Sequence, residues 1–207
     1  MTAPTAAMPT ENRGDASFSR TSADDVLAAW SAAPLALRLT SLSAALAALA
    51  STASDVVPLA SGLAIAFLVP AALVDWHQRR LPDAIVLVAT ALFALSLLAT
   101  VANGSAPSIA GIGLGAAVLA GPLLIMHLVS PAAMGFGDVK AAVVLGMAVG
   151  AVAWALVPWA LIAAAGSTAA VGALRRQVTV PFGPGLVAGS LVVVLTSALL
   201  GLDRIGI

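Results

Sequence analysis

Two aspartates stand beside long apolar segments, where a charged side chain is costly. Asp75 ends one apolar stretch, in the segment LVDWHQRRLPDAIV that begins at Leu73. Asp138 begins another, in the segment PAAMGFGDVKAAVV that begins at Pro131. Carboxylates close to a bilayer are rare and often mark a functional site. The first question is therefore what chemistry two such acids could perform together.

A pair of carboxylates supports aspartic-protease chemistry. When two acids lie a few ångströms apart they cannot both ionise, so one pKa rises and the pair shares a proton. The ionised partner can take a proton from water while the protonated partner polarises a carbonyl. Partial burial in lipid and protein would help to keep one acid neutral. Other chemistries have less support, because the chain has no cysteine and no Ser/His/Asp set stands out.

The residues around Asp138 suit the close approach of an extended peptide. Gly135 and Gly137 remove side chains from the place where a substrate backbone would pass. They also allow a bend between a loop and a helix, and at such a bend Asp138 could instead act as a helix N-cap. Lys140 follows two positions later. It could extend to the membrane interface or bias the ionisation of Asp138.

The composition places both aspartates in a membrane protein. Of the 207 residues 61% are hydrophobic and 9% are charged, and the mean hydropathy is +1.08, whereas soluble domains carry about a quarter charged residues. Nine basic and nine acidic residues give zero net charge, so nothing indicates a nucleic-acid partner. The apolar runs do not alternate with polar residues as barrel strands do. We therefore expect an all-α polytopic membrane protein in contact with the lipid bilayer.

Apolar bands predict a bundle of six or seven transmembrane helices. Residues 1–33 are polar and predict a disordered cytoplasmic tail, and residues 34–207 form the transmembrane domain. The fifth band is too long for one span and contains Gly150 and Pro158, so we interpret it as two helices that break near Gly150. The bands lie at about 35–53, 56–74, 84–101, 108–130, 139–174 and 184–202.

Basic residues in the loops orient these bands. Three loops on one side carry Lys or Arg and the opposite loops carry none, so the positive-inside rule places the basic loops in the cytoplasm. This arrangement requires the fifth band to be a hairpin. Asp75 and Asp138 then lie at the cytoplasmic face at similar depth, where helix packing can bring them together. The basic residues are Arg79, Arg80, Lys140, Arg175 and Arg176.

Three segments, in order along the chain, resemble the motifs of the type IV prepilin peptidases, which are membrane aspartic proteases. The sequence GFGD at 135–138 matches the GxGD signature of that family. The sequence DWHQRRLPD at 75–83 resembles the first family motif, and PFGP at 181–184 resembles a third element before the last helix. The resemblance covers roughly residues 56–202.

The resemblance implies a function and a site. Asp75 and Asp138 would be the catalytic pair of an aspartic endopeptidase that removes the short basic leader of a pilin-like precursor. The enzyme would be a multi-pass protein of the bacterial plasma (inner) membrane, with its active site at the cytoplasmic face. Further residues that would bind substrate or shape the site are Pro82, Gly135, Phe136, Gly137, Lys140, Pro181, Phe182, Gly183 and Pro184.

The chain departs from many larger members of that family. It has no cysteine-rich insert and no glycine-rich site for a methyl-donor nucleotide. It is similar to the compact branch that serves Flp/Tad-type pili, so we expect peptidase activity without N-methyltransferase activity and without a cofactor. His77 and His127 have no acidic partners nearby in sequence, so no metal site is expected. The pilus assembly machinery could be a further partner.

Two other classes of function remain open. A small proton-coupled transporter subunit would also contain membrane carboxylates, but these would be expected at mid-bilayer. A non-catalytic membrane assembly factor is the second alternative. Taken singly, Asp75 would be read as a polar stop at a helix end, and Asp138 as an N-cap. The two together, with the glycines, favour catalysis.

Overall fold

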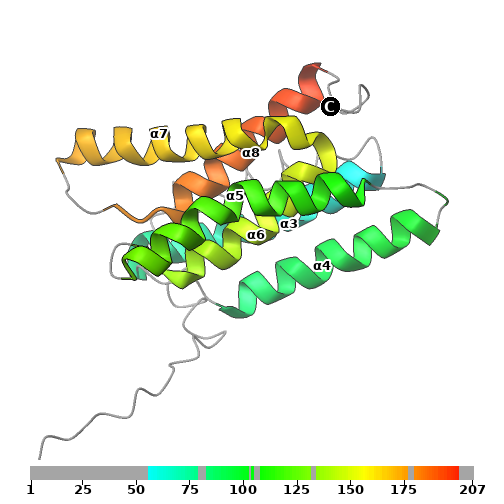
Figure 1. The fold of residues 1–207 in the computed structure, drawn as a ribbon, viewed down its shortest axis with the longest axis horizontal. Coiled ribbons are helices and arrows are strands. Elements are labelled where there is room, and N and C mark those ends of the chain that lie inside the picture. The colour runs from blue at the N-terminus through cyan, green and yellow to red at the C-terminus, as the bar shows by residue number, and fades with distance from the viewer. Residues whose placement is uncertain are drawn as a thin grey trace, which may run out of the picture.

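The computed structural model describes residues 56–78, 83–102, 104, 108–131, 134–176 and 180–200. The expected tail at 1–33 and the first apolar band at 35–53 lie outside these residues. The described chain is helical, as Figure 1 shows. Its elements are α3 (Val56–Gln78), α4 (Asp83–Ala102), α5 (Ile109–Val129), α6 (Phe136–Ala153), the 3₁₀ turn η1 (Trp154–Leu156), α7 (Val157–Arg175) and α8 (Gly183–Leu200).

The expected class, an all-helical membrane protein, is confirmed, but the expected number of spans is not. Among the described residues three segments are long and apolar enough to cross a membrane: Ile85–Ala102, Ile109–Val129 and the 40-residue segment Phe136–Arg175. The apolar parts of α3 and α8 are shorter, at Ser61–Ala72 and Gly183–Ser197. Within the described residues the structure therefore supports three long spans, and the expected six or seven are not supported.

The fifth band consists of two helices, as expected, but the break lies after Gly150. α6 continues to Ala153, whose backbone leaves the helical region (φ −157°, ψ 86°), and α7 begins at Val157. Pro158 explains this position, because it has no N–H to donate to the carbonyl of Trp154 and its ring crowds that carbonyl. A proline in the first turn of α7 is well tolerated.

Gly150 lies in a close contact between α5 and α6 instead. A Cβ atom built on Gly115 would lie against the carbonyl oxygen of Gly146 and 2.7 Å from the Cα of Gly150. A Cβ on Gly150 would meet the carbonyl oxygen of Gly111 in the same way. Glycines four residues apart on both helices thus let the two backbones touch, an arrangement common between membrane helices. This contact was not predicted from the sequence.

A similar contact joins α7 to α8. A Cβ on Gly189 would lie 2.7 Å from the backbone nitrogen of Ala164, and a Cβ on Gly185 would lie 2.7 Å from the carbonyl oxygen of Ala164. Small residues at both positions of α8 therefore hold it close to α7.

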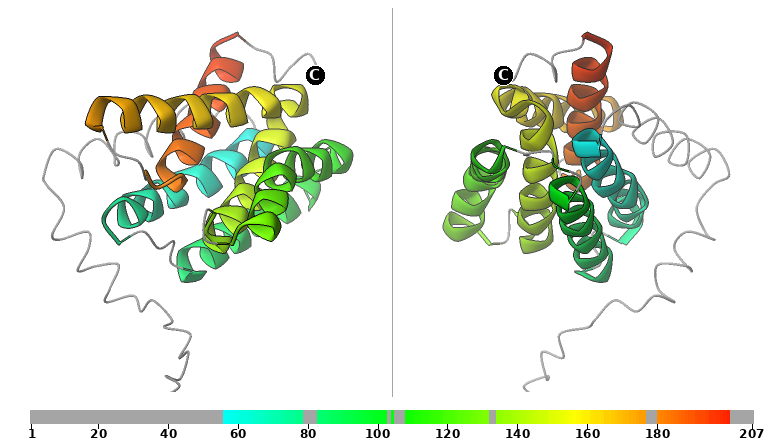
Figure 2. Two further views of the ribbon diagram at one scale, coloured as in Figure 1. Left: turned by 60° about the vertical axis from the view of Figure 1, so that its left-hand side comes forward. Right: turned by 90° about the vertical axis from the view of Figure 1, so that its right-hand side faces the viewer.

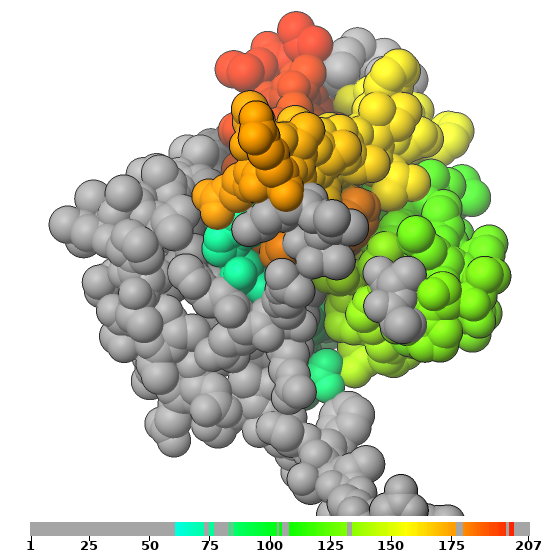
Figure 3. Space-filling view, turned by 90° about the vertical axis from the view of Figure 1, so that its left-hand side faces the viewer, coloured from blue at the N-terminus to red at the C-terminus, as the bar shows by residue number. Residues whose placement is uncertain are grey.

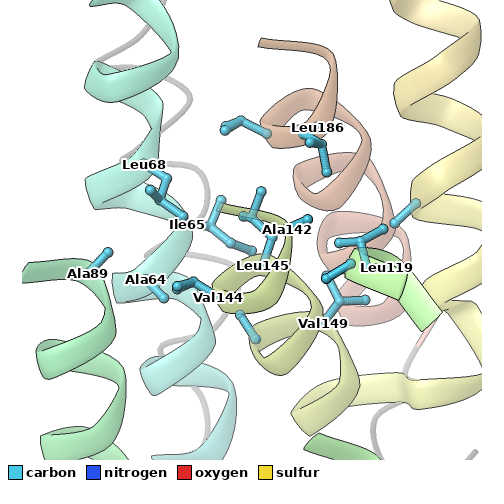
Figure 4. Packing of buried hydrophobic residues seen from close by; sticks show 14 of the residues in the cluster. Ala64, Ile65, Leu68, Ala89, Leu119, Ala142, Val144, Leu145, Val149 and Leu186 are labelled. Atoms are coloured by element: carbon cyan, nitrogen blue, oxygen red, sulfur yellow. The ribbon is translucent and has the colours of Figure 1, made fainter. Parts of the chain in front are cut away.

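Helix α6 occupies the centre of the bundle, where it contacts α3, α4, α5 and α8. The two views of Figure 2 show it between its neighbours. Figure 4 shows Leu145 of α6 among buried side chains from the surrounding helices, including Ile65 and Leu68 of α3 and Leu186 of α8. This packing fixes the helix that carries Asp138.

Helix α7 returns to the end of the bundle at which α6 begins (Figure 1). The guanidinium of Arg175, the last residue of α7, lies 4.7 Å from the centre of the Trp76 ring in the last turn of α3. The ends of α3 and α7 and the starts of α6 and α8 therefore meet at one end of the molecule. Figure 3 views the molecule from this end, where the end of α3 is teal and the end of α7 is orange.

Candidate active site

Asp75 lies in the last turn of α3, next to the first turn of α8. Its side chain is only 5% exposed, and its Oδ2 is buried without a hydrogen-bond partner. The backbone N–H of Gly183 donates to its carboxylate. This N–H is available because the first N–H groups of a helix have no partner within the helix. The positive end of the α8 dipole therefore lies against Asp75 and stabilises negative charge there.

The PFGP segment gives α8 the geometry that this contact needs. The carbonyl of Phe182 accepts the N–H of Leu186 at 3.0 Å, which closes the first turn. Gly183 is buried and is the first residue of α8. Pro184 is the second residue of the helix, where its missing N–H costs nothing. Phe182 packs against the hydrophobic core, and Pro181 is half-buried.

Asp138 is the third residue of α6 and does not cap it. The N-cap is Gly135, and no side chain hydrogen-bonds to the helix start. The backbone N–H of Asp138 donates to the carbonyl of Gly135 at 3.1 Å, while its carboxylate is half-buried with Oδ1 out of reach of any partner. The structure therefore does not support the alternative in which Asp138 is only a helix cap.

The two carboxylates face a common site between α3, α6 and α8. They are close enough that the charge of Asp75 acts directly on Asp138. Each has one oxygen buried without a hydrogen-bond partner in the part of the chain that the structure describes. An unsatisfied buried carboxylate oxygen destabilises the fold. Two neighbouring carboxylates with such oxygens do not help the protein to fold. They are, however, the kind of group that a catalytic site uses.

The glycines of GFGD have different environments. Gly135 is exposed, and its backbone (φ −68°, ψ 138°) is in a region open to any residue. A Cβ there would lie 3.8 Å from Oδ2 of Asp138. Its lack of a side chain therefore leaves space at the carboxylate rather than allowing an unusual conformation. Gly137 is half-buried in the first turn of α6, and Phe136 is half exposed.

Lys140 is not directed to the carboxylate pair. Its Nζ lies 2.9 Å from Oδ1 of Asp83 at the start of α4, and 5.1 Å from the centre of the Phe136 ring. Lys140 follows Asp138 by two residues, which places it about 200° around the helix. The expected influence of Lys140 on the ionisation of Asp138 therefore has no contact to support it.

His127 lies near the site, although the sequence did not predict a contribution from it. Its Nδ1 lies 2.8 Å from the carbonyl oxygen of Met134, and its ring centre lies 5.3 Å from that of Phe136. Because a carbonyl oxygen can only accept, Nδ1 must carry a proton and donate. His127, in the last turn of α5, is thus hydrogen-bonded to Met134, two residues before α6 begins. The only hint in the sequence was that His127 lies seven residues before Met134, close enough along the chain for the two to meet.

The remaining predicted residues divide into two groups. Pro82, Arg79 and Arg80 lie outside the described residues, so their placement stays a prediction. The guanidinium of Arg175 lies over the ring of Trp76, next to Asp75, and its expected place at the membrane boundary stays a prediction. Within the described ranges no three His, Asp or Glu side chains gather as metal ligands.

Fold and site together define a helical membrane protein with a two-carboxylate site at one end of its bundle. A model of the type IV leader peptidase family matches residues 62–202, which is more than half of the chain. The chain belongs to the type IV leader peptidase family. The matched range contains Asp75, Asp138 and the PFGP segment, and the resemblance drawn from the three motifs is confirmed. Searches of curated proteins and of solved structures returned no match.

Proposed function

We propose that this chain is an aspartic endopeptidase that removes the leader of type IV prepilins, with Asp75 and Asp138 as its catalytic pair. The observation that carries the proposal is the meeting of two carboxylates, each with one buried oxygen that has no hydrogen-bond partner, within the range matched by a leader peptidase family. The substrate is a pilin-like precursor whose basic leader precedes an apolar helix.

The surroundings of the two acids support different roles. Each acid lies at the positive end of one helix dipole, that of α8 for Asp75 and that of α6 for Asp138, so the dipoles do not distinguish them. The Gly183 N–H donates to Asp75, whereas Oδ1 of Asp138 has no hydrogen-bond partner among the described residues. We therefore assign the base to Asp75 and the shared proton to Asp138. Asp75 takes a proton from water, which attacks the peptide carbonyl, while Asp138 donates its proton to the carbonyl oxygen. The C–N bond of the tetrahedral intermediate then breaks as the leaving nitrogen gains a proton from Asp75 and one hydroxyl of the intermediate returns a proton to Asp138, which restores the starting state.

The position of the acids supports a protease over a proton-coupled transporter. Asp75 is in the last turn of α3 and Asp138 in the first turn of α6. A carboxylate of an ion path would be expected nearer the middle of a span. An acid at the membrane boundary can meet both water and a peptide that emerges from the bilayer.

The arrangement in the membrane is part of the same proposal. Lys140, Arg175 and Arg176 lie at the ends of helices that carry or adjoin the aspartates, which by the positive-inside rule favours the cytoplasm. Because α6 and α7 run in opposite directions, the 40-residue apolar segment would cross the bacterial plasma membrane twice. The absence of cysteine favours a compact Flp/Tad-type enzyme without N-methyltransferase activity.

The decisive experiment is co-expression with a short pilin-like precursor, followed by N-terminal sequencing of the product. We expect cleavage after the basic leader by the parent chain. Asp75→Asn and Asp138→Asn should each lower the cleavage rate by about 10²- to 10⁴-fold, as expected for loss of a general acid or base. Asp203→Asn, which changes an aspartate outside the described residues, is the control for loss of one carboxylate and should cleave normally. Parental activity in Asp138→Asn would refute the assignment.

A further inference from the structure

An apolar groove separates α4 from α6 on the side of the bundle away from the carboxylate pair. Its volume is about 440 Å³. We call it the α4–α6 groove. It is lined by Asp83, Val86, Leu87 and Thr90 of α4 and by Lys140, Val143, Val144 and Met147 of α6.

The groove is apolar along its length and charged at one end. Val143 and Val144 lie along its α6 wall. The one hydroxyl in it, that of Thr90, donates to the carbonyl of Val86 at 2.7 Å and is therefore satisfied. At the charged end the Lys140 ammonium meets the Asp83 carboxylate at 2.9 Å, with their side chains 35% and 48% exposed.

The α4–α6 groove is separate from the proposed catalytic site. Lys140 and Met147 lie about 200° and about 180° around α6 from Asp138, on the opposite side of the helix. The catalytic carboxylates therefore do not use this groove.

The groove opens on a surface suited to lipid. Leu87, one of its lining residues, is 70% exposed, and Leu95 and Leu98 further along α4 are similarly exposed. Helix α4 lies at the edge of the bundle in Figure 1. A membrane protein exposes such a row of leucines to acyl chains rather than to water.

The size of the groove favours a single hydrocarbon chain over a protein helix. Two turns of a helix, about 10 Å across and about 11 Å long, fill about twice the volume of the groove. From Lys140 to Met147 the α6 wall extends about 10 Å, which suits the part of an acyl chain nearest its headgroup.

We propose that the α4–α6 groove binds one acyl chain of a phospholipid with a zwitterionic, N–H-bearing headgroup, of which phosphatidylethanolamine is the type. The charges are complementary: the lipid phosphate accepts from the Lys140 ammonium, and the lipid ammonium donates to the Asp83 carboxylate. Lys140 and Asp83 lie side by side as a cation and an anion. A zwitterionic headgroup can therefore bind both at once, with its phosphate at Lys140 and its ammonium at Asp83. The bound lipid would join the starts of α4 and α6.

The headgroup preference gives the first test, which is independent of proteolysis. The full chain is purified from mixed vesicles of phosphatidylethanolamine, phosphatidylcholine and phosphatidylglycerol, and retained lipid is counted by native mass spectrometry. We expect one retained phosphatidylethanolamine. Phosphatidylcholine has no N–H to donate and phosphatidylglycerol has no cation, so each should be retained about tenfold less. Equal retention of all three, or a retained protein helix in place of lipid, would overturn the proposal.

A pair of matched variants locates the lipid. Val143→Trp fills the groove from α6, and Val192→Trp makes the same change at a 54% exposed position of α8 outside it. Only the first should reduce retention of phosphatidylethanolamine. Lys140→Gln is a second variant that leaves the groove open, and it should remove the headgroup preference while weaker binding remains. Unfolding temperatures identify any variant that fails to fold. If Val143→Trp folds and retains lipid like Val192→Trp, the site is not this groove.

Discussion

At the scale of single residues, the two aspartates resemble functional groups rather than structural ones. A carboxylate that stabilises a fold has its oxygens satisfied, whereas Asp75 and Asp138 each keep a buried oxygen without a partner. Removing the charge of either aspartate should therefore lower activity without lowering stability. If the aspartates had a structural role, stability would fall as well.

The stability of the neutral variants tests this directly. We expect Asp75→Asn to unfold at the same temperature as the parent or at a higher one, because the amide removes a buried charge and its oxygen can still accept from Gly183. The measurement is thermal unfolding in detergent, alongside the cleavage assay. A variant that loses both activity and several degrees of stability would indicate a structural role for Asp75.

The Gly183 N–H can be removed without removing the helix. Gly183→Pro deletes the donor at a position where proline suits a helix start, and Gly183→Ala keeps the donor. We expect the proline variant to have a kcat/KM lower by about tenfold or more than the alanine variant, the loss expected for one hydrogen bond to a charged group. Equal activity of the two variants would show that the Gly183 N–H neither holds Asp75 in position nor stabilises its negative charge.

At the scale of the helices, the sequence predicted which segments are helical but not how closely they pack. The breaks around Asp75, Asp138 and the PFGP segment follow from polar residues and prolines that interrupt apolar runs. The contact of Gly115 with Gly146 was not predicted, because glycines inside a helix suggest flexibility when each helix is considered alone. Their role in close backbone packing becomes visible only when the two helices are considered together.

Two glycines of α5 make this packing testable. A Cβ at Gly115 would meet the backbone of α6, whereas a Cβ at Gly113 would meet nothing within 4 Å. We expect Gly115→Ala to destabilise the protein by about 1–3 kcal/mol through overpacking. Gly113→Ala should be neutral or stabilising by up to about 1 kcal/mol, because alanine favours the helix. Equal unfolding free energies would mean that α5 and α6 are not in backbone contact.

At the scale of the whole molecule, we predicted that Asp75 and Asp138 meet because both were expected at the same membrane face, and in the structure the charge of Asp75 does act on Asp138. The pairing of Lys140 with Asp83 could not be predicted, since the side of α6 on which Lys140 lies depends on where α4 packs. We predicted the break in the fifth band a few residues too early, because a glycine inside an apolar run suggests a hinge. In the structure Gly150 instead packs against α5.

The orientation of the bundle can be measured because the chain has no cysteine of its own. Arg176→Cys lies at the end that holds the aspartates, and Ala102→Cys lies at the far end of α4, on the opposite side. A membrane-impermeant maleimide should label the first only in inverted vesicles and the second only in intact cells. The reverse pattern would place the carboxylate pair outside the cytoplasm.

The glycine contact between α5 and α6 has a consequence for how a peptide bond could be enclosed. Since these two helices touch through their main chains, α6 and its Asp138 have little room to shift relative to α5. Asp75 and its Gly183 partner belong to α3 and α8, which hold α6 through side chains that can re-pack. If the site opens to admit a peptide, we would therefore expect α3, and α8 together with α7, to move relative to Asp138.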